Sequence, residues 1–359
     1  MRLRGMDLRT VQRLISWSMR SVPGGLRHVF LCVADHYEPD LGNASDAVRL
    51  DRVERWMRDY PRSVEGIADS VGRQPRQTFF YPLEEYRPVL LDRLGELCRM
   101  GLGEVEVHLH HDGESSQQLR DRLETFKHTL HDRHGLLRRD ELGAIRYGFI
   151  HGNWALDNSR PDGRWCGVND ELTVLRETGC YADFTMPSAP DPTQTRTFNS
   201  IYYATDDPAA PKSHDTGTPA RVGQRAPENT LLMIQGPLII DWRDRKSGLV
   251  PRLENGDLHA DRPPAARRLN LWLQAGVHVQ GRPEWFFVKL HTHGAKPANA
   301  DVLLGSPMRR LHEELQSRAE ADASFRYYYV TAHEMARLVR AAEDGETDPR
   351  SVLTQGSAT

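Results

Sequence analysis

The chain has 359 residues, of which 38% are hydrophobic and 27% charged, so it can bury a sizeable core in one large or two ordinary domains, and wholesale disorder is excluded. The formal net charge of −3 argues against a nucleic-acid binder, which usually carries a basic excess. The four cysteines form no C-x-x-C pair, so neither a zinc ribbon nor a disulfide framework is indicated, and reduced thiols in a cytosolic protein are the simplest interpretation.

The first segment, residues 1–27, interleaves arginines with Leu14, Ile15, Trp17 and Met19. It lacks the long apolar centre of a signal peptide, and no stretch of the chain approaches the ~20 apolar residues of a membrane span. The pattern predicts a basic amphipathic helix. Such a helix packs on the domain or rests on a membrane surface, so we expect a cytoplasmic protein, with peripheral contact at the inner face of the membrane as the alternative.

From residue 28 onward, short apolar runs typical of strands alternate with longer runs of helical period. The predicted strands cover 28–36, 77–83, 104–111, 144–152, 180–186, 231–242, 284–292 and 325–331. The predicted helices cover 46–69, 88–100, 115–134, 169–178, 264–276, 299–319 and 333–343. This alternation, repeated seven or eight times, predicts a parallel sheet covered by helices. We expect a single α/β domain over residues 28–344, a distorted (β/α)7-8 barrel with long inserted loops, and a doubly wound open sheet is the second choice.

Three segments lack a sustained period. Residues 187–230 are rich in Pro, Asp, Thr and Ser, which predicts a functional loop or a disordered insert. Residues 243–263 form a second irregular stretch. The last residues, 345–359, are expected to form a flexible polar tail.

Polar side chains gather where the predicted strands end, which is where barrels of this kind carry their reactive groups. They are Asp35, His36 and Glu38 after the first strand, Glu84 and Glu85 after the second, His108, His110, His111 and Asp112 after the third, His151, Asn153 and Trp154 after the fourth, Asp241 after the sixth, and His291 and His293 after the seventh. Imidazoles and carboxylates that converge can hold a divalent cation, and nitrogen ligands favour zinc. An open coordination position would activate water. The sequence therefore predicts a metal site on this rim.

Other histidines and motifs carry less weight. His128, His131 and His134 lie on a polar predicted helix and are expected on the solvated surface, while His214, His259 and His278 are isolated. No G-x-S-x-G elbow, G-x-G-x-x-G or P-loop occurs, so a serine nucleophile and a nucleotide-phosphate cradle lack support.

Four short motifs, "VADH", "QTFF", "HLHHDGE" and "VKLHTHG", follow one another in an order that resembles the polysaccharide deacetylase family of carbohydrate esterases, within the glycoside hydrolase/deacetylase barrel superfamily. The resemblance covers roughly residues 28–294. It implies Asp35 as catalytic base, His36 with His110 or His111 as metal ligands, and His291 as general acid. The family's second metal-binding histidine is absent, and Glu114 is a substitute. The Asp-Asp pair of the family is Asp-His here, "FIHGNW" replaces its Arg-x-Pro motif, and residues 187–230 have no counterpart in a minimal member.

The resemblance implies a metal-dependent hydrolase of carbon–nitrogen or ester bonds, which removes acetyl groups from a saccharide in exopolysaccharide metabolism. Trp154 would stack on a sugar face, and the expected contacts to the saccharide are Glu38, His151, Asn153, Asp157, Asp241 and His293. One alternative is a glycoside hydrolase that uses paired carboxylates from among Asp35, Glu38, Glu84 and Asp241. Another is a sugar-binding or scaffold protein without catalytic activity in a membrane-associated assembly.

Overall fold

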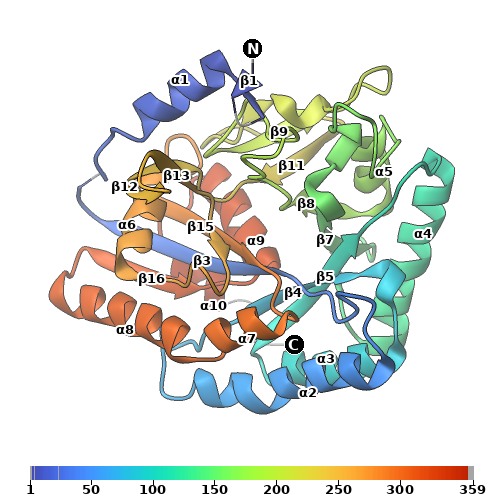
Figure 1. Cartoon of the computed structure of the whole chain (residues 1–359), viewed down its shortest axis with the longest axis horizontal. Helices are drawn as coiled ribbons and strands as arrows, with labels where there is room; N and C mark the ends of the chain where they lie inside the picture. The colour runs from blue at the N-terminus through green and yellow to red at the C-terminus, as the bar shows by residue number, and fades with distance from the viewer. Residues whose placement is uncertain (1, 4, 23, 355–359) are drawn as a thin grey trace.

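A large, mostly parallel sheet forms the centre of the computed structural model, which describes residues 2–3, 5–22 and 24–354 (Figure 1). The strands of this 12-stranded sheet run in the order β10-β9-β11-β8-β7-β5-β4-β3-β15-β14, with β16 beside the first half of β3 and β6 beside β7. Their bounds are β3 (Arg27–His36), β4 (Gln77–Pro82), β5 (Gly103–Leu109), β6 (Arg138–Arg139), β7 (Ile145–His151), β8 (Cys180–Asp183), β9 (Ile201–Thr205), β10 (Thr218–Pro219), β11 (Thr230–Ile234), β14 (Asp257–Leu258), β15 (Trp285–Thr292) and β16 (Phe325–Tyr329).

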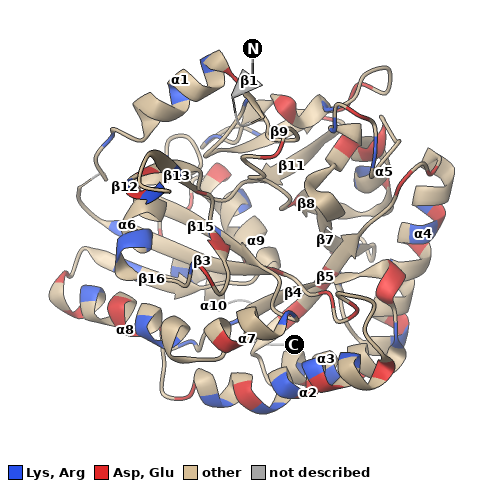
Figure 2. Ribbon diagram, in the orientation of Figure 1, with Lys and Arg blue, Asp and Glu red and all other residues tan. Residues whose placement is uncertain are grey.

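Helices surround this sheet, and most of them cover its outer face (Figure 1). Their bounds are α1 (Leu8–Trp17), α2 (Asp46–Ser63), α3 (Pro88–Arg99), α4 (Ser116–His128), α5 (Glu171–Thr178), α6 (Ala266–Ala275), α7 (Pro297–Leu303), α8 (Ser306–Ala321), α9 (Ala332–Glu343) and α10 (Pro349–Thr354). Acidic and basic residues alternate along the outer helices α2, α3 and α8 (Figure 2). Two small hairpins, β1 (Arg2–Leu3) with β2 (Met6–Asp7) and β12 (Ile239–Lys246) with β13 (Val250–Glu254), lie outside the main sheet. Single helical turns span Leu83–Glu85, Thr129–Arg133, Gly152–Trp154, Leu156–Asn158 and Ser213–Asp215.

Side chains alternate between the two faces of β3, as the period of a strand requires. Leu31 and Val33 join the core beneath α2 and α8, whereas Cys32 and Ala34 join a second core on the inner face. The same alternation sends Asp35 to the outer face and His36 to the inner face.

Helix α9 lies against the inner face and fills its amino end. Thr331 and Glu334 form a capping box at the start of the helix. The amide of Ala332 donates to Thr78 Oγ1 at 3.0 Å, and the amide of His333 donates to Glu104 Oε1 at 2.9 Å, so the helix begins at the first residues of β4 and β5. The carboxyl ends of the strands are therefore the open side of the sheet.

The predicted α/β architecture with a parallel sheet is confirmed. The described strands pair in a path from β10 to β14, with no ladder between these two ends. Lys289 on β15 nevertheless reaches across the inner face, and its ammonium group donates to the carbonyls of Phe184 and Met186 at 2.6 and 2.7 Å.

Several elements differ from their predictions. Residues 187–230 contain β9, which pairs with β11 over five residues, so this segment extends the sheet. The predicted strand 231–242 is two strands, because Gly236 and Pro237 interrupt it, and the predicted helix 299–319 breaks at Gly305 into α7 and α8. The part of the expected tail that is described forms α10, with Val352 and Leu353 buried; residues 355–359 lie outside the described residues.

The predicted N-terminal helix is α1, and residues 1, 4 and 23 of its segment lie outside the described residues. Leu14 is buried in a small core with Phe198 and Leu238. The indole of Trp17 donates to the carbonyl of Ala275 at 2.9 Å. This helix therefore packs on the domain.

Candidate metal centres

Four histidines and a glutamate meet on the inner face, at the carboxyl ends of β3, β5 and β15; we call them the inner group. They form two triads that share Glu38, namely His36, Glu38 and His293, and Glu38, His108 and His110. The ring of His36 stacks on that of His293 with centroids 4.9 Å apart and meets that of His108 edge-on at the same distance.

Hydrogen bonds fix which ring nitrogens of the inner group carry protons. His108 donates from Nδ1 to the carbonyl of Ile150 at 2.8 Å, and His110 donates from Nδ1 to Glu84 Oε1 at 2.5 Å. In the neutral rings each Nε2 therefore keeps its lone pair. Both lone pairs face the same oxygen, Glu38 Oε1, at 3.1 and 3.4 Å. Three acceptors directed at one another repel unless a proton or a cation lies between them. A metal-binding imidazole usually donates its other ring N–H to a carbonyl or carboxylate, as both rings do here.

The protonation states in the inner group also suit a cation. Burial lowers the pKa of His36 well below its usual range, with His293 adding to the effect, and burial lowers the pKa of His293 as well. Burial alone would raise the pKa of Glu38, but a hydrogen bond and positive charge from the doubly protonated form of His108 outweigh burial, so the pKa of this carboxyl is lowered. Burial also acts to lower the pKa of His110, but the hydrogen bond and charge of Glu84 outweigh it and raise this pKa. His36 and His293 thus already have the neutral form that metals bind, whereas a cation at His110 would displace a proton.

A cleft opens beside the inner group. Its volume is about 350 Å³, and it is lined by Leu41, Asp257, His259, Ala260, Asp261, His293, Lys296 and Asn299. A second cleft of about 260 Å³ shares Asp257 and continues toward Lys246, Arg252 and Arg262. His293 thus belongs both to the inner group and to a polar opening large enough for a ligand.

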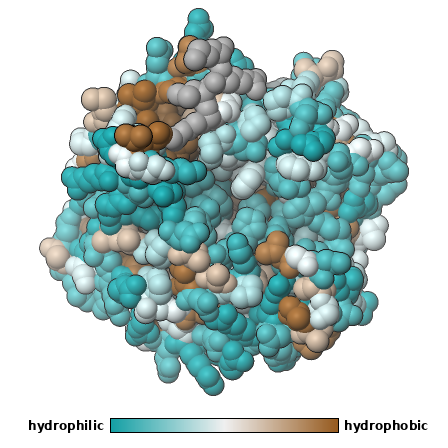
Figure 3. Space-filling model, in the orientation of Figure 1, coloured by the Kyte–Doolittle hydropathy of each residue, from teal (hydrophilic) through white to brown (hydrophobic). Residues whose placement is uncertain are grey.

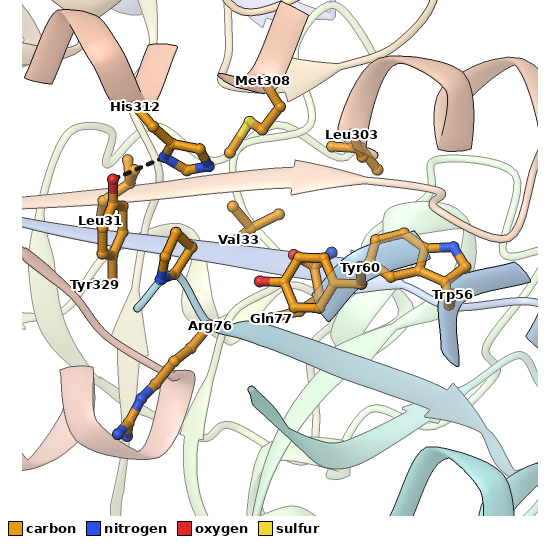
Figure 4. A pocket seen from close by; sticks show the side chains of 11 residues that line it. Leu31, Val33, Trp56, Tyr60, Arg76, Gln77, Leu303, Met308, His312 and Tyr329 are labelled. Atoms are coloured by element: carbon orange, nitrogen blue, oxygen red, sulfur yellow. Dashed lines mark hydrogen bonds between the residues drawn. The ribbon is translucent and has the colours of Figure 1, made fainter. Parts of the chain in front are cut away.

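The cavity in Figure 4 is a different feature and contains none of these ligands. It is a gap of about 10 Å³ on the outer face, between β3 and the helices α2, α7 and α8. His312 and Tyr329 meet at its edge through a hydrogen bond of 2.8 Å (Figure 4). Its size leaves room for about one water molecule.

A second cluster, the outer group, lies behind the same rim on the outer face. Its members are His111, His151, Cys166 and Glu171, all buried, and their ligand atoms lie within 4.8 Å of one another. His111 Nε2 is 3.1 Å from Glu171 Oε1 and 2.9 Å from His151 Nε2. Burial lowers the pKa of His151 to about 4. Burial alone would raise the pKa of the Glu171 carboxyl. The neighbouring His151 and His111 outweigh burial and lower this pKa to about 2. This cluster could hold a metal ion.

The expected metal ligands His36, His110 and His111 do not come together as one set. His36 and His110 join the inner group, whereas His111 joins the outer group with His151, which we had expected to contact the substrate. Adjacent residues point to opposite faces, so a consecutive pair such as His110 and His111 is divided between the two groups. Glu114 Oε1 pairs with Arg122 instead of approaching His110.

Asp35, the expected base, is fully buried on the outer face of β3. Its Oδ1 accepts from the amide of Gly294 at 2.6 Å and its Oδ2 from the side chain of Gln77 at 2.9 Å. Burial raises the pKa of this carboxyl to about 7. Asp35 thus fixes the loop that follows β15, and its carboxylate does not join the inner group.

The remaining expected site residues are scattered. His291 lies on the inner face with its ring centroid 6.3 Å from that of His36, and its Nδ1 has no partner among the described residues. Asn153 and Trp154 lie in the turn after β7 with positive φ. Asp157 is buried and accepts from the amide of Ser213 at 2.6 Å. The expectation that Asp241 ends a strand of the main sheet was wrong, because it lies in the β12–β13 hairpin and pairs with Arg267.

Cys166 and Glu171 were not identified as site residues from the sequence. Cys166 lies in a loop and Glu171 begins a helix, so neither directly follows a predicted strand along the chain. It also left His108 out of the ligand set, although the strand period puts His108 and His110 on one face. His134, which was expected on the surface, is buried between Asp92 and Tyr86, at 2.8 and 3.1 Å.

No protein-family model matches the chain, and no curated protein matches it significantly. Among the described residues, no helix combines the length and the apolar character needed to cross a bilayer.

Proposed function

We propose that this protein is a metal-dependent hydrolase whose reaction takes place at the inner group. The observation that carries the proposal is the convergence of two imidazole lone pairs on Glu38 Oε1, beside an open polar cleft. His36, Glu38, His108, His110 and His293 are the ligand candidates, and their predominance of nitrogen favours zinc. We also propose that the sheet curves into a barrel, in which the hydrogen bonds of Lys289 link β15 to the segment after β8.

A bound divalent cation would lower the pKa of a coordinated water and polarise a carbonyl oxygen. The protein's own residues would do the rest. Glu84 orients the ring of His110 through the Nδ1 hydrogen bond. His291, on the same face with a free Nδ1, is the candidate for proton transfer to the leaving group. Asp35 acts as a positioning residue, because both of its oxygens are engaged by Gly294 and Gln77.

An acetylated saccharide is the proposed substrate. The cleft beside His293 is lined by Asp257, Asp261, Lys296 and Asn299, which offer donors and acceptors suited to hydroxyl groups. The sequence motifs shared with the deacetylases point to the same substrate class. The four described cysteines are free, which suits a reducing compartment such as the cytoplasm.

The test combines metal analysis with acetate release from acetylated saccharides. We expect purified protein to contain zinc, and we expect a chelator to abolish acetate release and zinc to restore it. A protein that gains no metal on dialysis and releases no acetate would overturn the proposal. Formation of new reducing ends without acetate, insensitive to chelator, would instead favour a glycoside hydrolase.

The surface near α1 supports the expected membrane contact. Met19 and Leu249 are 75% and 78% exposed, and Trp242 and Val250 are also exposed nearby on the β12–β13 hairpin. The indole of Trp242 donates to the carbonyl of Ser18, which joins the hairpin to the end of α1. Apolar side chains gather at this corner, at the upper left of Figure 3. Exposed basic residues accompany them, namely Arg9, Arg13, Arg20, Arg243, Arg245 and Lys246. We propose that this corner contacts anionic lipid headgroups.

A further inference from the structure

We propose that the outer group binds a second zinc ion, in a closed structural site formed by His111, His151, Cys166 and Glu171. This site is separate from the inner group and takes no part in the proposed reaction. Two nitrogens, one sulfur and one oxygen complete a tetrahedron and leave no position for water or substrate, which distinguishes structural from catalytic zinc.

The four side chains lie close enough for such a tetrahedron, because their ligand atoms are within 4.8 Å of one another; the imidazoles face one oxygen of Glu171 and Cys166 faces the other. Zinc bonds of about 2.0 to 2.3 Å imply ligand atoms roughly 3.3 to 3.7 Å apart. Glu171 Oε1 lies 3.1 and 3.5 Å from Nε2 of His111 and His151, and Glu171 Oε2 lies 3.3 Å from Cys166 Sγ. The two Nε2 atoms are 2.9 Å apart, so a small separation of the rings completes the geometry.

Two unpartnered atoms beside the cluster point to the metal-bound form. His111 Nδ1 and Glu114 Oε2 are both buried without a hydrogen bond to any residue that the structure describes, and they face one another at 4.0 Å. With zinc on Nε2, His111 carries its proton on Nδ1 and gains this carboxylate as acceptor, which is the carboxylate–histidine–zinc arrangement. His151 already donates from Nδ1 to the carbonyl of Gly152 at 2.5 Å, so its Nε2 is the free atom.

Charge and hydrogen bonding around Cys166 also suit the metal-bound state. The amides of Asn158 and Val168 donate to Sγ at 3.2 and 3.5 Å, as they would to a thiolate. Zinc binding would displace the proton of this thiol to solvent. One thiolate and one carboxylate then neutralise the two charges of the ion, which removes the cost of burying a net charge.

The proposed ion would join four separate segments behind the rim. They are the end of β5, the end of β7, the loop that carries Cys166, and the first turn of α5. Gly152, next to His151, lies so close to His110 that a Cβ there would be 2.2 Å from His110 Cδ2. The outer site thus fixes the backbone against which a ligand of the inner group rests.

Cobalt substitution tests the second site independently of activity. We expect metal-stripped protein titrated with Co²⁺ to bind two equivalents and to develop a near-ultraviolet thiolate-to-cobalt charge-transfer band. In Cys166→Ser the band should disappear and metal content should fall by one equivalent. Cys98→Ser, on α3 away from both groups, is the matched control and should retain both equivalents and the band.

Glu38→Gln separates this proposal from the proposed function. It should lose inner-group metal and acetate release but keep the charge-transfer band. Absence of the band in the wild-type protein, or its persistence in Cys166→Ser, would overturn the closed site while leaving the hydrolase proposal intact. If Cys166→Ser does not fold, X-ray absorption of the wild-type zinc protein decides: one sulfur at about 2.3 Å supports the site, and nitrogen and oxygen alone overturn it.

Discussion

Glu38 is the residue on which the inner group converges. Glu38→Gln keeps the shape of the side chain but removes the charge that faces His108 and His110. We expect acetate release to fall on the order of 100-fold or more, with loss of inner-group metal. Glu65→Gln, an exposed change after α2, is the control and should behave as wild type. Full metal content in Glu38→Gln would contradict the assignment.

Gly152 tests the position of His110. Gly152→Ala introduces a methyl group 2.2 Å from His110 Cδ2, and because this ring is partly exposed it can move aside. We therefore expect acetate release to fall about 10- to 100-fold while thermal stability changes little. Gly24→Ala, with no atom within 4 Å of the added Cβ, should leave both unchanged. Equal activity of the two variants would show that His110 is not needed.

His312 is a buried histidine far from either group, at the edge of the cavity in Figure 4. Burial lowers its pKa to about 3, so between pH 3 and 6.5 the unfolded chain binds a proton that the folded chain does not. The free energy of unfolding must then fall as pH falls through this window, by up to about 1.4 kcal/mol per pH unit from this residue. His312→Asn should reduce the slope by about one proton in denaturant titrations from pH 6.5 to 4.5. His128→Asn, on the exposed side of α4, should keep the wild-type slope.

The period of a strand indicates at residue level that His108 and His110 share a face, as do His291 and His293. The same rule implies that Asp35 and His36 point to opposite faces of the sheet. The family resemblance instead implies that both belong to one site. The strand period cannot identify Cys166 and Glu171, because these residues do not lie on a strand. The loop that brings them to the site turns at Asp157 and Asn158, which have positive φ. The convergence of strand residues could thus be predicted, whereas candidate ligands brought in by tertiary contact could not.

Helix α10 shows how an element with a polar sequence gains stability by docking. Leu353 is 3% exposed against α9, and the carbonyl of Val352 accepts from Arg337 at 3.1 Å. We expect Leu353→Ala to lower the free energy of unfolding by about 2 kcal/mol, at the low end for a buried leucine, because the site lies at the edge of the core. Leu142→Ala, at a leucine 91% exposed, should change it by less than about 0.5 kcal/mol in the same denaturant titration. Similar values for the two would mean that α10 is not docked in solution.

At the level of elements, strands with a clear apolar run could be predicted, including the short β8 and β16, whereas β9 could not. The strands β3, β4, β5 and β15 lie within one or two residues of their predictions. Strand β9 escaped prediction because its five residues are set among prolines and turns, and its hydrogen bonds are completed by its partners β11 and β10. Pairing of this kind depends on tertiary structure, not on local sequence.

At the scale of the whole molecule, the proposed membrane contact of the apolar and basic corner at α1 can be measured directly by vesicle sedimentation. We expect the full chain to sediment with vesicles that contain anionic lipid and not with neutral vesicles. The double change Met19→Ser and Leu249→Ser should reduce the bound fraction several-fold, because it removes the two most exposed apolar anchors of this corner. Leu142→Ser, an exposed leucine elsewhere, is the control. Equal sedimentation of all three proteins would rule out the anchor.

Helix α9 has a kinetic consequence. Since it fills the amino end of the inner face, we expect a small molecule to reach the inner group from the rim at the carboxyl ends of the strands. In the proposed reaction, substrate and deacetylated product would then share one passage, and bound product would block the next substrate. Inhibition by the deacetylated saccharide should accordingly be competitive, and a longer product, which spans both clefts joined at Asp257, should inhibit more strongly than a short one.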